Sequence, residues 1–427
     1  MILQKFKNWW GNVDENFKRV ILTLIFSVTV VLLAILIYYV FFKTRIPETP
    51  PFPPTTLPGG TLPVTDIRDI LRQHGVPVGE EPIPTLTPSE LKPDLVAQGG
   101  RTFAEPRVFA DVENAGIDSQ GNVNFYNAKD GKFYTLDAEG NIISLSEQSF
   151  PQVEKVTWSP REKQAVLEFP DHSNVFYNFT TNRQYTLPKE AGGFGFSSSG
   201  DSIAYTFITN NPDENWLIVS QPTGNNAHAV EHIGSADPRD VLVNWSPDGS
   251  KVAFYRSSAD VDQEEVIPIG QNRENFQSLS IEGRGFESLW SPHGAYLLYN
   301  VYSANTGYRP ELWVTNARAD AFGTEPLNLG LRTWISKCTF AKAEATVFCA
   351  VPVYLSQGTG IYPQAGENTP DIIYTINIAT GFKQRIAIPT NALGIGAYSV
   401  QKLFLTPDES ILRLITTDGG IYEVRLK

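Results

Sequence analysis

A short phrase recurs about seven times between Ile117 and Thr416, and it constrains the fold more than any other feature of the chain. Its clearest copy starts at Trp245 and reads WSPDGSKVAF. In this phrase a large apolar residue precedes a turn of Ser-Pro-Asp-Gly type, and an apolar run suited to a return strand follows. Each copy therefore predicts one tight β-hairpin. The other copies start at Ile117, Trp158, Phe196, Trp290, Phe340 and Leu405.

The spacing of these copies predicts the architecture. Successive copies start between 38 and 65 residues apart, and two further strand-like runs follow the hairpins. After the Trp158 copy, for example, these runs are Asn174–Phe179 and Arg183–Leu187. Four short strands in a unit of roughly 40–50 residues are typical of a β-propeller blade. We therefore predict an all-β fold in which residues 107–427 form a seven-bladed β-propeller of four-stranded blades.

The WSPDG-type turns resemble the repeat of the TolB-like (WD40-like) β-propeller family, and the resemblance covers about three quarters of the chain. TolB-type propellers bind protein partners in the cell envelope, so the resemblance implies a similar binding function here. The same repeat occurs in prolyl oligopeptidases and dipeptidyl peptidases, which carry a separate α/β-hydrolase domain for which this sequence leaves no room. TolB itself is soluble and has a further N-terminal domain, whereas this chain has an apolar N-terminal segment. Tol–Pal partners therefore do not follow from the resemblance.

That N-terminal segment is a candidate membrane span. Val20–Phe42 is a run of 23 uncharged residues, of which 17 are Leu, Ile, Val or Phe. At about 1.5 Å per residue, such a helix crosses a hydrocarbon core of about 30 Å. The alternative is a cleaved signal peptide, but the apolar region of a signal peptide is only about 7–15 residues long and precedes a small-residue cleavage site. We predict a retained transmembrane helix over residues 20–42.

Basic residues near the span predict its orientation. Because basic residues favour the cytoplasmic side, the N-terminus is expected in the cytoplasm and the propeller outside it, in a single-pass protein of the inner or plasma membrane. Residues 1–19 have apolar residues every three or four positions, which predicts an amphipathic segment in the membrane interface, with an unstructured tail as the alternative. The basic residues are Lys5, Lys7, Lys18 and Arg19 before the span, and Lys43 and Arg45 after it.

Residues 43–106 are predicted to form a proline-rich extracytoplasmic linker. The 13 prolines between Ile46 and Pro106 disfavour helix and sheet interiors and favour an extended stalk. A segment near residues 65–74 has the capping residues of a short helix, which would dock a partner, pack on the propeller or stay loosely ordered. The last blade shows only three strands, so Arg107–Asp111 is expected to supply its outer strand and close the ring.

The two cysteines are expected to form a disulfide. Cys338 and Cys349 lie in the sixth hairpin, where a plain antiparallel register places them opposite each other. Directly opposite residues have Cβ atoms about 4.5–5.5 Å apart, which is near disulfide reach, and export would allow oxidation. The alternative is a pair of buried thiols.

No motif in the sequence indicates catalysis, a metal or a cofactor. The formal net charge is −12, which excludes the basic surface that a nucleic-acid-binding protein needs. The sequence has no G-x-S-x-G nucleophile motif, and its five histidines, at positions 74, 172, 228, 232 and 293, are not spaced as metal ligands. Asp260–Glu265 is interpreted as a solvated acidic loop rather than a cation site. We therefore assign no catalytic residue, metal site or cofactor.

Connections between second and third strands indicate a binding surface. In blades 3–6 these connections are long, and in a propeller they all emerge on one face; they are Thr209–Asn215, Ser257–Glu264, Ser303–Pro310 and Ser356–Pro370. Tyr and Arg are favoured at binding hot spots, and no folding role is expected on such loops. Ordinary variation of surface loops is the alternative. The candidate partner-binding residues are Tyr302, Tyr308, Arg309 and Tyr362.

The sequence thus predicts a membrane-anchored, extracytoplasmic β-propeller that binds or scaffolds a protein partner in the cell envelope. Two alternatives stay open: a sensor for glycan or peptide ligands, and an envelope hydrolase or lyase that uses the propeller channel. Paired carboxylates or a metal at the channel mouth would favour the enzyme. An exposed aromatic face would favour partner binding.

Overall fold

The structure, a computed structural model, describes residues 26–33, 92–318 and 321–427. The chain divides into two units, Met1–Ile83 and Pro84–Lys427. Residues 26–33 of the first unit are helical. The predicted segment 1–19, most of the predicted span 20–42 and the predicted helix near 65–74 lie outside the described residues. Among the described residues, no helix is both long enough and apolar enough to cross a membrane.

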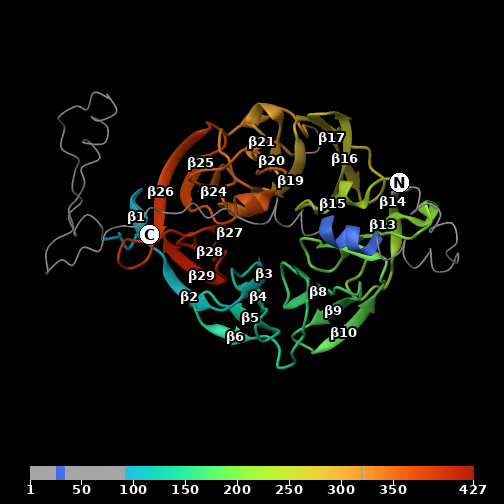
Figure 1. Ribbon diagram of the computed structural model, residues 1–427, viewed down its shortest axis with the longest axis horizontal. Coiled ribbons are helices and arrows are strands. Elements are labelled where there is room, and N and C mark those ends of the chain that lie inside the picture. Colours follow the sequence, from blue (N-terminus) through green and yellow to red (C-terminus); the bar gives the residue numbers. More distant parts are fainter. Residues whose placement is uncertain (1–25, 34–91, 319–320) are drawn as a thin grey trace, which may run out of the picture. The chain divides into compact units, whose positions relative to one another are not determined.

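In the second unit, seven β-sheets form a ring, which confirms the seven-bladed β-propeller (Figure 1). Blades 1 to 3 each have four antiparallel strands. Blade 1 consists of β3 (Val112–Ile117), β4 (Val123–Asn127), β5 (Lys132–Leu136) and β6 (Ile142–Ser144). Blade 2 consists of β7 (Lys155–Trp158), β8 (Gln164–Glu168), β9 (Asn174–Asn178) and β10 (Arg183–Leu187). Blade 3 consists of β11 (Ala191–Phe196), β12 (Ile203–Phe207), β13 (Trp216–Ser220) and β14 (His228–His232).

The remaining blades follow in chain order, and the last two each recruit a strand from the start of the domain. Blade 4 has β15 (Val241–Val243), β16 (Lys251–Asp260), β17 (Gln263–Gly270) and β18 (Leu279–Glu282). Blade 5 has β19 (Arg284–Trp290), β20 (Tyr296–Tyr302), β21 (Glu311–Asn316) and β22 (Leu327–Asn328). Blade 6 has β23 (Cys338–Phe340), β24 (Thr346–Pro352), β25 (Asp371–Asn377), β26 (Phe382–Thr390) and β1 (Arg101–Phe103). Blade 7 has β27 (Val400–Leu405), β28 (Ile411–Thr416), β29 (Gly420–Arg425) and β2 (Glu105–Phe109).

The strand order fixes what each face of the ring carries. In every blade the first strand lies near the axis, and the later strands follow outward in alternating directions (Figure 1). The hairpins between first and second strands therefore share one face, which we call the turn face. The connections between second and third strands, and those from one blade to the next, share the other face, which we call the loop face. Five short 3-10 helices lie in the connections: η2 (Pro212–Glu214), η3 (Pro238–Asp240), η4 (Ala304–Thr306), η5 (Ile335–Lys337) and η6 (Pro363–Ala365).

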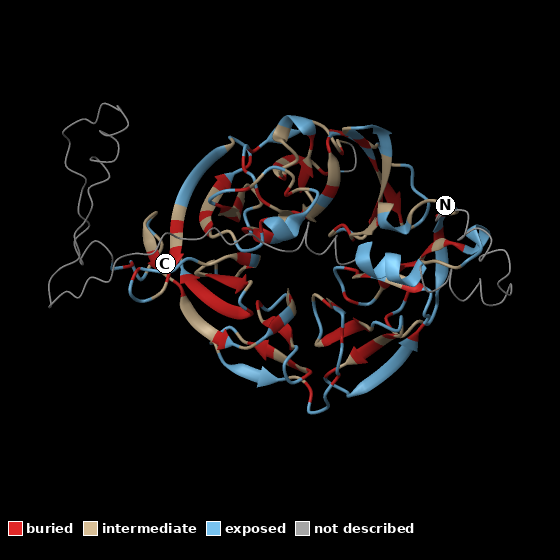
Figure 2. Cartoon of the chain, in the orientation of Figure 1, coloured by how far each residue is buried: buried red, intermediate tan, exposed pale blue. Residues whose placement is uncertain are grey.

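The core consists of seven hydrophobic clusters, one between each pair of neighbouring blades. Between blades 1 and 2, the Phe133 ring lies 5.6 Å from Trp158 and 4.9 Å from Phe179, measured between ring centroids. The middle strands are largely buried, whereas outer strands such as β6 and β10 are exposed (Figure 2). Each blade thus completes its core only against its neighbours, as the sequence repeat implies.

The repeated phrase forms the turns that the sequence predicts. In the clearest copy, the Ser246 hydroxyl accepts a hydrogen bond from the Lys251 backbone N–H at 2.9 Å, and Gly249 has a left-handed backbone with φ 72°. The copies that start at Phe340 and Leu405 place Glu344 and Glu409 in this left-handed position, with φ 44° and 57°. A left-handed backbone costs a non-glycine residue roughly 1–2 kcal/mol. These two copies therefore keep the turn at a local cost in conformational energy.

The two glutamates connect neighbouring blades on the turn face. Glu344 accepts hydrogen bonds from the Ser291 hydroxyl at 2.7 Å and the His293 backbone N–H at 2.6 Å, which joins blade 6 to blade 5. Glu409 accepts a hydrogen bond from the Lys342 backbone N–H at 2.8 Å, which joins blade 7 to blade 6. Charge-assisted bonds of this kind are stronger than neutral ones, so they offset the backbone strain at both positions.

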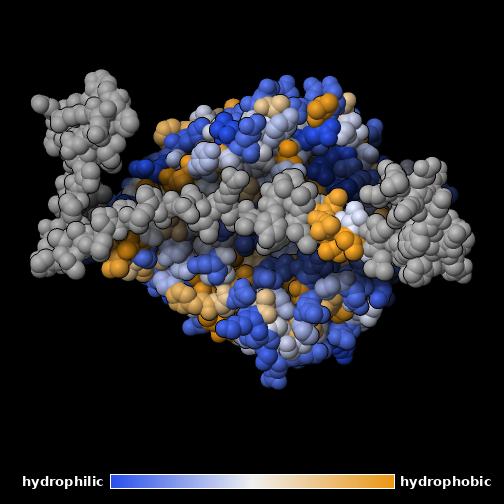
Figure 3. All heavy atoms as spheres, in the orientation of Figure 1, coloured by the Kyte–Doolittle hydropathy of each residue, from blue (hydrophilic) through white to orange (hydrophobic). Residues whose placement is uncertain are grey.

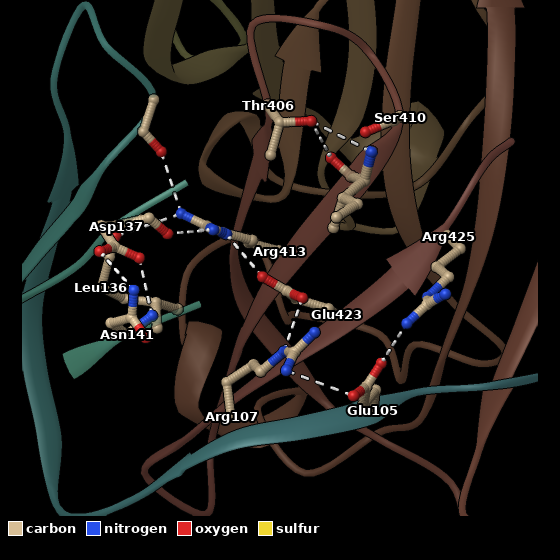
Figure 4. A network of polar contacts seen from close by, with 12 residues as sticks. Glu105, Arg107, Leu136, Asp137, Asn141, Thr406, Ser410, Arg413, Glu423 and Arg425 are labelled. Carbon is tan, nitrogen blue, oxygen red and sulfur yellow. Dashed lines mark hydrogen bonds and ion pairs between the residues drawn. The ribbon is translucent and has the colours of Figure 1, made fainter. Parts of the chain in front are cut away.

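The ring is closed by both ends of the domain, as predicted. β2 pairs antiparallel with β29 as the outer strand of blade 7, although it covers residues 105–109 rather than 107–111. Next to it, Glu423 accepts hydrogen bonds from Arg413 Nε at 2.9 Å and Arg107 Nε at 2.7 Å (Figure 4). Arg413 is fully buried and also donates to three backbone carbonyls of blade 1, those of Gly121, Leu136 and Asp137. Polar contacts therefore hold the seam between blades 7 and 1 together with apolar packing.

The propeller begins before the predicted boundary at residue 107. β1 pairs in parallel with β26 as a fifth strand of blade 6, so this blade departs from the predicted four strands. The Ile388 N–H donates to the Gly100 carbonyl at 2.8 Å, and the Ala97 N–H donates to the Arg425 carbonyl at 2.8 Å. Residues 92–106, which the sequence analysis assigned to the linker, are thus bonded to blades 6 and 7. A parallel strand whose partner is far away in the sequence leaves no local pattern, so proline content placed the boundary too late.

The predicted disulfide is present in the sixth hairpin. Cys338 and Cys349 lie opposite each other in β23 and β24, their Cα atoms are 4.1 Å apart, and their sulfur atoms are bonded. Both residues are buried in the hydrophobic cluster between blades 5 and 6. This burial is typical of a structural disulfide rather than a reactive one.

Candidate partner-binding surface

The four residues predicted to bind a partner lie on the loop face, where the connections of blades 5 and 6 meet. Tyr302 ends β20, Tyr308 and Arg309 follow in the connection to β21, and Tyr362 lies in the connection between β24 and β25. Their exposure differs, however. Tyr362 is 69% exposed, whereas the other three residues are half-buried.

The Tyr302 side chain packs inside the junction of the two loops. A side chain added at Gly285 or Gly360 would overlap the Tyr302 side chain, so both glycine backbones lie directly against it. Burial raises the pKa of the Tyr302 hydroxyl, and the nearby Glu264 carboxylate raises it further. The phenol is therefore neutral, and much of its surface is used within the protein.

The Arg309 guanidinium connects the two loops. Its Nε donates to the Leu355 carbonyl of blade 6 at 2.8 Å, and its Nη1 donates to the Thr306 carbonyl of blade 5 at 3.2 Å. Hydrogen bonds from a charged group typically contribute about 1.5–3 kcal/mol each. The expectation that this position has no folding role is therefore wrong, because the guanidinium orders the loops.

Backbone hydrogen bonds reinforce the same junction. The Gly360 N–H donates to the Tyr308 carbonyl at 2.7 Å, and the Gly358 N–H donates to the Gly307 carbonyl at 3.0 Å. Tyr308 has a left-handed backbone with φ 54°, an unfavourable conformation for a tyrosine. The long connection of blade 6 is therefore held against blade 5 by both side-chain and backbone bonds.

Exposed apolar side chains are concentrated in two connections of blade 6, one of which contains Tyr362. In the described part of the propeller, 14 large hydrophobic residues are exposed, and six of them lie in two connections of blade 6. These connections touch, since the Asp371 N–H donates to the Tyr398 carbonyl at 2.9 Å. In Figure 3, apolar patches interrupt a largely hydrophilic surface, and one lies beside β1 at the edge of the ring. We call the six residues the blade 6 apolar surface: Val353, Tyr354, Ile361, Tyr362, Leu393 and Ile395.

The two connections that form the blade 6 apolar surface contain almost no charged residue, although the Arg101 guanidinium of β1 donates to the Gly394 carbonyl at 2.6 Å. Residues 353–370 contain one acidic residue, Glu367, and no Lys or Arg, and residues 391–399 contain no charged residue. Depletion of charge together with exposed aromatic side chains is characteristic of the centre of a protein interface. Of the six residues of the blade 6 apolar surface, only Tyr362 was predicted from the sequence. The absence of charge over two successive loops of one blade was the signal that could have identified the other five residues.

The connection of blade 4, predicted as a long loop, is an extended hairpin. β16 and β17 pair as far as Asp260 and Gln263, so that only residues 261–262 form the turn. Val261 at the tip is 72% exposed. The Asp262 carboxylate accepts a hydrogen bond from the Ala304 N–H at 3.1 Å, which joins the tip to the blade 5 connection. A continuous surface therefore extends from the tip of blade 4, across blade 5, to blade 6.

Two titratable groups on innermost strands, Glu287 and Lys402, have shifted pKa values. Glu287, on β19, is exposed to solvent, yet desolvation by the surrounding protein raises the pKa of its carboxyl. Desolvation lowers the pKa of the Lys402 ammonium, on β27, and the charge of Lys155 lowers it further. The Lys402 Nζ donates to the Ala115 carbonyl at 2.8 Å rather than to a carboxylate. Within residues 26–33, 92–318 and 321–427, no group of three His, Cys, Asp or Glu side chains could hold a metal.

A hollow of about 1140 Å³ lies on the loop face between blades 2, 3 and 4. Its lining includes both signs of charge, with Lys189 and Asp171 paired at 3.7 Å and Glu190, Glu214 and Arg239 nearby. Hydrogen bonds from the Ser173 hydroxyl and backbone lower the pKa of Asp171. Such a lining would suit the ligand-sensor alternative, because mixed polar groups can bind hydroxyls.

The chain matches no family model and no curated protein, whereas several solved structures share its fold. The β-propeller domain of Cps50 (Swd1) from Myceliophteria thermophila is 11% identical, with a TM-score of 0.52 over 76% of this chain and 100% of that chain. An oligogalacturonate lyase in complex with manganese is 13% identical, with a TM-score of 0.51 over 75% of this chain and 92% of that chain. TolB from Acinetobacter baumannii is 12% identical, with a TM-score of 0.41 over 62% of each chain. At such identities the similarity to the first two structures shows the propeller fold and no activity.

Proposed function

We propose that this chain is a membrane-anchored, extracytoplasmic β-propeller that binds a protein partner of the cell envelope through the blade 6 apolar surface. The observation that carries the proposal is the concentration of six of the 14 exposed large hydrophobic residues of the described propeller in two adjoining loops. Scattered apolar residues are normal on a protein surface. Exposed apolar residues concentrated in neighbouring loops with few charges are instead typical of an interaction site.

The order of the loops supports this function. Arg309, the Tyr302 ring and the backbone bonds at Gly358 and Gly360 hold the blade 6 connection in one conformation. A loop that is ordered before binding loses less conformational entropy in the complex. Three of the residues predicted to contact a partner thus act mainly by positioning the surface, and Tyr362 contacts the partner directly.

The location of the protein rests on its sequence. Val20–Phe42 has the length and apolarity of a transmembrane helix, and the proline-rich residues that follow would separate the propeller from the bilayer. Removal of residues 1–45 is expected to release a folded, soluble propeller. If the truncated protein stays in the membrane fraction, the anchor has been assigned to the wrong segment.

The binding site is tested with tyrosine variants of the full-length protein. A photo-crosslinking residue at position 354 should capture a discrete envelope protein in cells, and purified partner should then bind the unmodified chain. Tyr362→Ala is expected to weaken this binding about thirtyfold, since truncation of a hot-spot aromatic costs roughly 2 kcal/mol or more. Its stability should change by less than about 0.5 kcal/mol, because the side chain is exposed.

Tyr185→Ala is the matched control, because Tyr185 is an exposed tyrosine on the outer strand of blade 2. It should leave the affinity unchanged. Equal affinities of the Tyr362→Ala and Tyr185→Ala proteins would place the binding site elsewhere.

A further inference from the structure

Charges around the blade 6 apolar surface indicate the chemistry of the partner. The connections and hairpin tip that join second to third strands in blades 3 to 6 contain a single cation, Arg309. Its guanidinium is half-buried and already donates to two carbonyls within the protein. The same segments carry four acidic residues, Asp213, Glu214, Asp262 and Glu367, and a fifth, Asp260, ends β16 directly beside the blade 4 tip.

These carboxylates are not neutralised within the protein. Four of them are exposed and Asp262 is half-buried. In the part of the chain that the structure describes, none of the five forms an ion pair. Among the described cations at this face of blades 3 to 7, Arg239 is paired with Asp237, Arg256 with Asp240 and Lys337 with Asp371. Two others, Arg332 and Arg284, form no ion pair among these residues, and the Arg284 guanidinium donates to the Asp260 carbonyl at 2.9 Å. The loop face of these blades therefore keeps a surplus of negative charge.

The acidic tip of blade 4 is continuous with the apolar surface. Asp262 is bonded to Ala304 in the blade 5 connection, and Arg309 of that connection is bonded to Leu355 in blade 6. A ligand that lies across the three blades would therefore meet apolar side chains at one end and unpaired carboxylates at the other.

On the basis of the proposed function, we infer that the partner presents an apolar anchor flanked by lysine or arginine residues. The anchor lies on the blade 6 apolar surface, and the cationic flank faces Asp260 and Glu367. Burial of the apolar anchor supplies most of the affinity. The exposed charges act mainly on the association rate, because solvent and salt screen them once the complex has formed.

The inference is tested with a library of random 12-residue peptides displayed on phage and selected on the full-length protein in detergent. Selected peptides are expected to share one or two aromatic or aliphatic anchors with at least two Lys or Arg nearby. A synthetic peptide of the selected sequence is then the probe for kinetic measurements. In the Asp260→Asn/Glu367→Gln double variant, its association rate should fall about tenfold at low salt and less than twofold at 0.5 M salt.

The matched control is Glu139→Gln/Glu162→Gln, which removes the same charge from exposed residues on the turn face. It should leave the association rate within about twofold of the unmodified protein, because these charges lie on the opposite side of the ring. A control variant that slows binding as much as the loop-face variant would show that net charge, rather than this surface, governs association. That result would overturn the inference.

The remaining outcomes separate this inference from the proposed function. If the selected peptides are acidic or uncharged but still require Tyr362, the partner has no basic residues beside its anchor. The inference is then wrong, whereas the proposed function is retained. If Tyr362→Ala does not change peptide binding, both the inference and the proposed binding site on the blade 6 apolar surface are wrong. Failure to enrich any peptide, or Tyr362-dependent binding of phosphatidylcholine vesicles in place of peptides, would equally refute a basic protein partner.

Discussion

Replacement of Arg413 by methionine should destabilise the closed ring more than any exposed charge change in the same network. The Arg413 side chain is fully buried between blades 7 and 1 and donates to the Glu423 carboxylate and to the Gly121, Leu136 and Asp137 carbonyls. Methionine has a similar length and is apolar, so Arg413→Met removes these hydrogen bonds with little change in packing volume. The variant therefore isolates the polar part of the closure.

The expected loss of stability follows from the buried polar groups that lose their partner when Arg413 is replaced. Glu423 is almost fully buried and keeps only the Arg107 contact at 2.7 Å. The Gly121 and Leu136 carbonyls lose a buried donor, and the Asp137 carbonyl loses a half-buried one. Removal of one partner from a buried ion pair typically costs about 3–5 kcal/mol. With a urea m-value of roughly 3 kcal/mol/M for a domain of this size, the unfolding midpoint should fall by about 1–1.7 M.

The matched control lies in the same network. Arg425 contacts Glu105 at 3.0 Å, but the two side chains are 54% and 30% exposed. Exposed ion pairs contribute about 0.2–1 kcal/mol, so Arg425→Met should shift the midpoint by less than about 0.4 M. Tryptophan fluorescence during urea unfolding measures both shifts. Equal midpoints for the two variants would refute the view that the buried arginine holds the ring closed.

Three further predictions concern the disulfide, the domain boundary and acid stability. Reduction of Cys338–Cys349 should cost roughly 2–3 kcal/mol, given the 11-residue separation; thiol labelling of unreduced, denatured protein should find no reactive cysteine, and two labelled thiols would contradict the bond. A fragment starting at residue 107 lacks β1 and the first residues of β2, so it should unfold at lower urea than one starting at residue 92; identical midpoints would show that β1 is dispensable. Hydrogen bonds from the Ser410 and Thr406 hydroxyls lower the pKa of Asp408 to about 2. This stabilisation is fully present above the ordinary aspartate value of about 4 and is lost as pH falls towards 2. Asp408→Asn should therefore flatten the pH dependence of the unfolding midpoint between pH 4 and 2. If the midpoint varies with pH as steeply as in the unmodified protein, Asp408 does not contribute this stabilisation.

The sequence alone determined the features that depend on local interactions. The turn phrase at Trp245 and its copies defined seven hairpins, because a β-turn is formed by the conformational preferences of four consecutive residues. Strand spacing then gave the number of blades. The facing positions of Cys338 and Cys349 followed from counting outward along one hairpin, and the missing outer strand of the last blade was correctly sought just before the first copy.

The tertiary structure decided everything that depends on residues far apart in the chain. The parallel pairing of β1 with β26 and the bond from Arg309 to blade 6 leave no periodic signal in the sequence. Exposure is likewise a tertiary property: Tyr302 and Tyr362 are both tyrosines of blade 5 and 6 loops, yet one is packed against two glycine backbones and the other is in solvent. The binding surface is therefore made by the contact between neighbouring blades, because side chains and backbone bonds of one loop fix which apolar residues of the next loop remain uncovered.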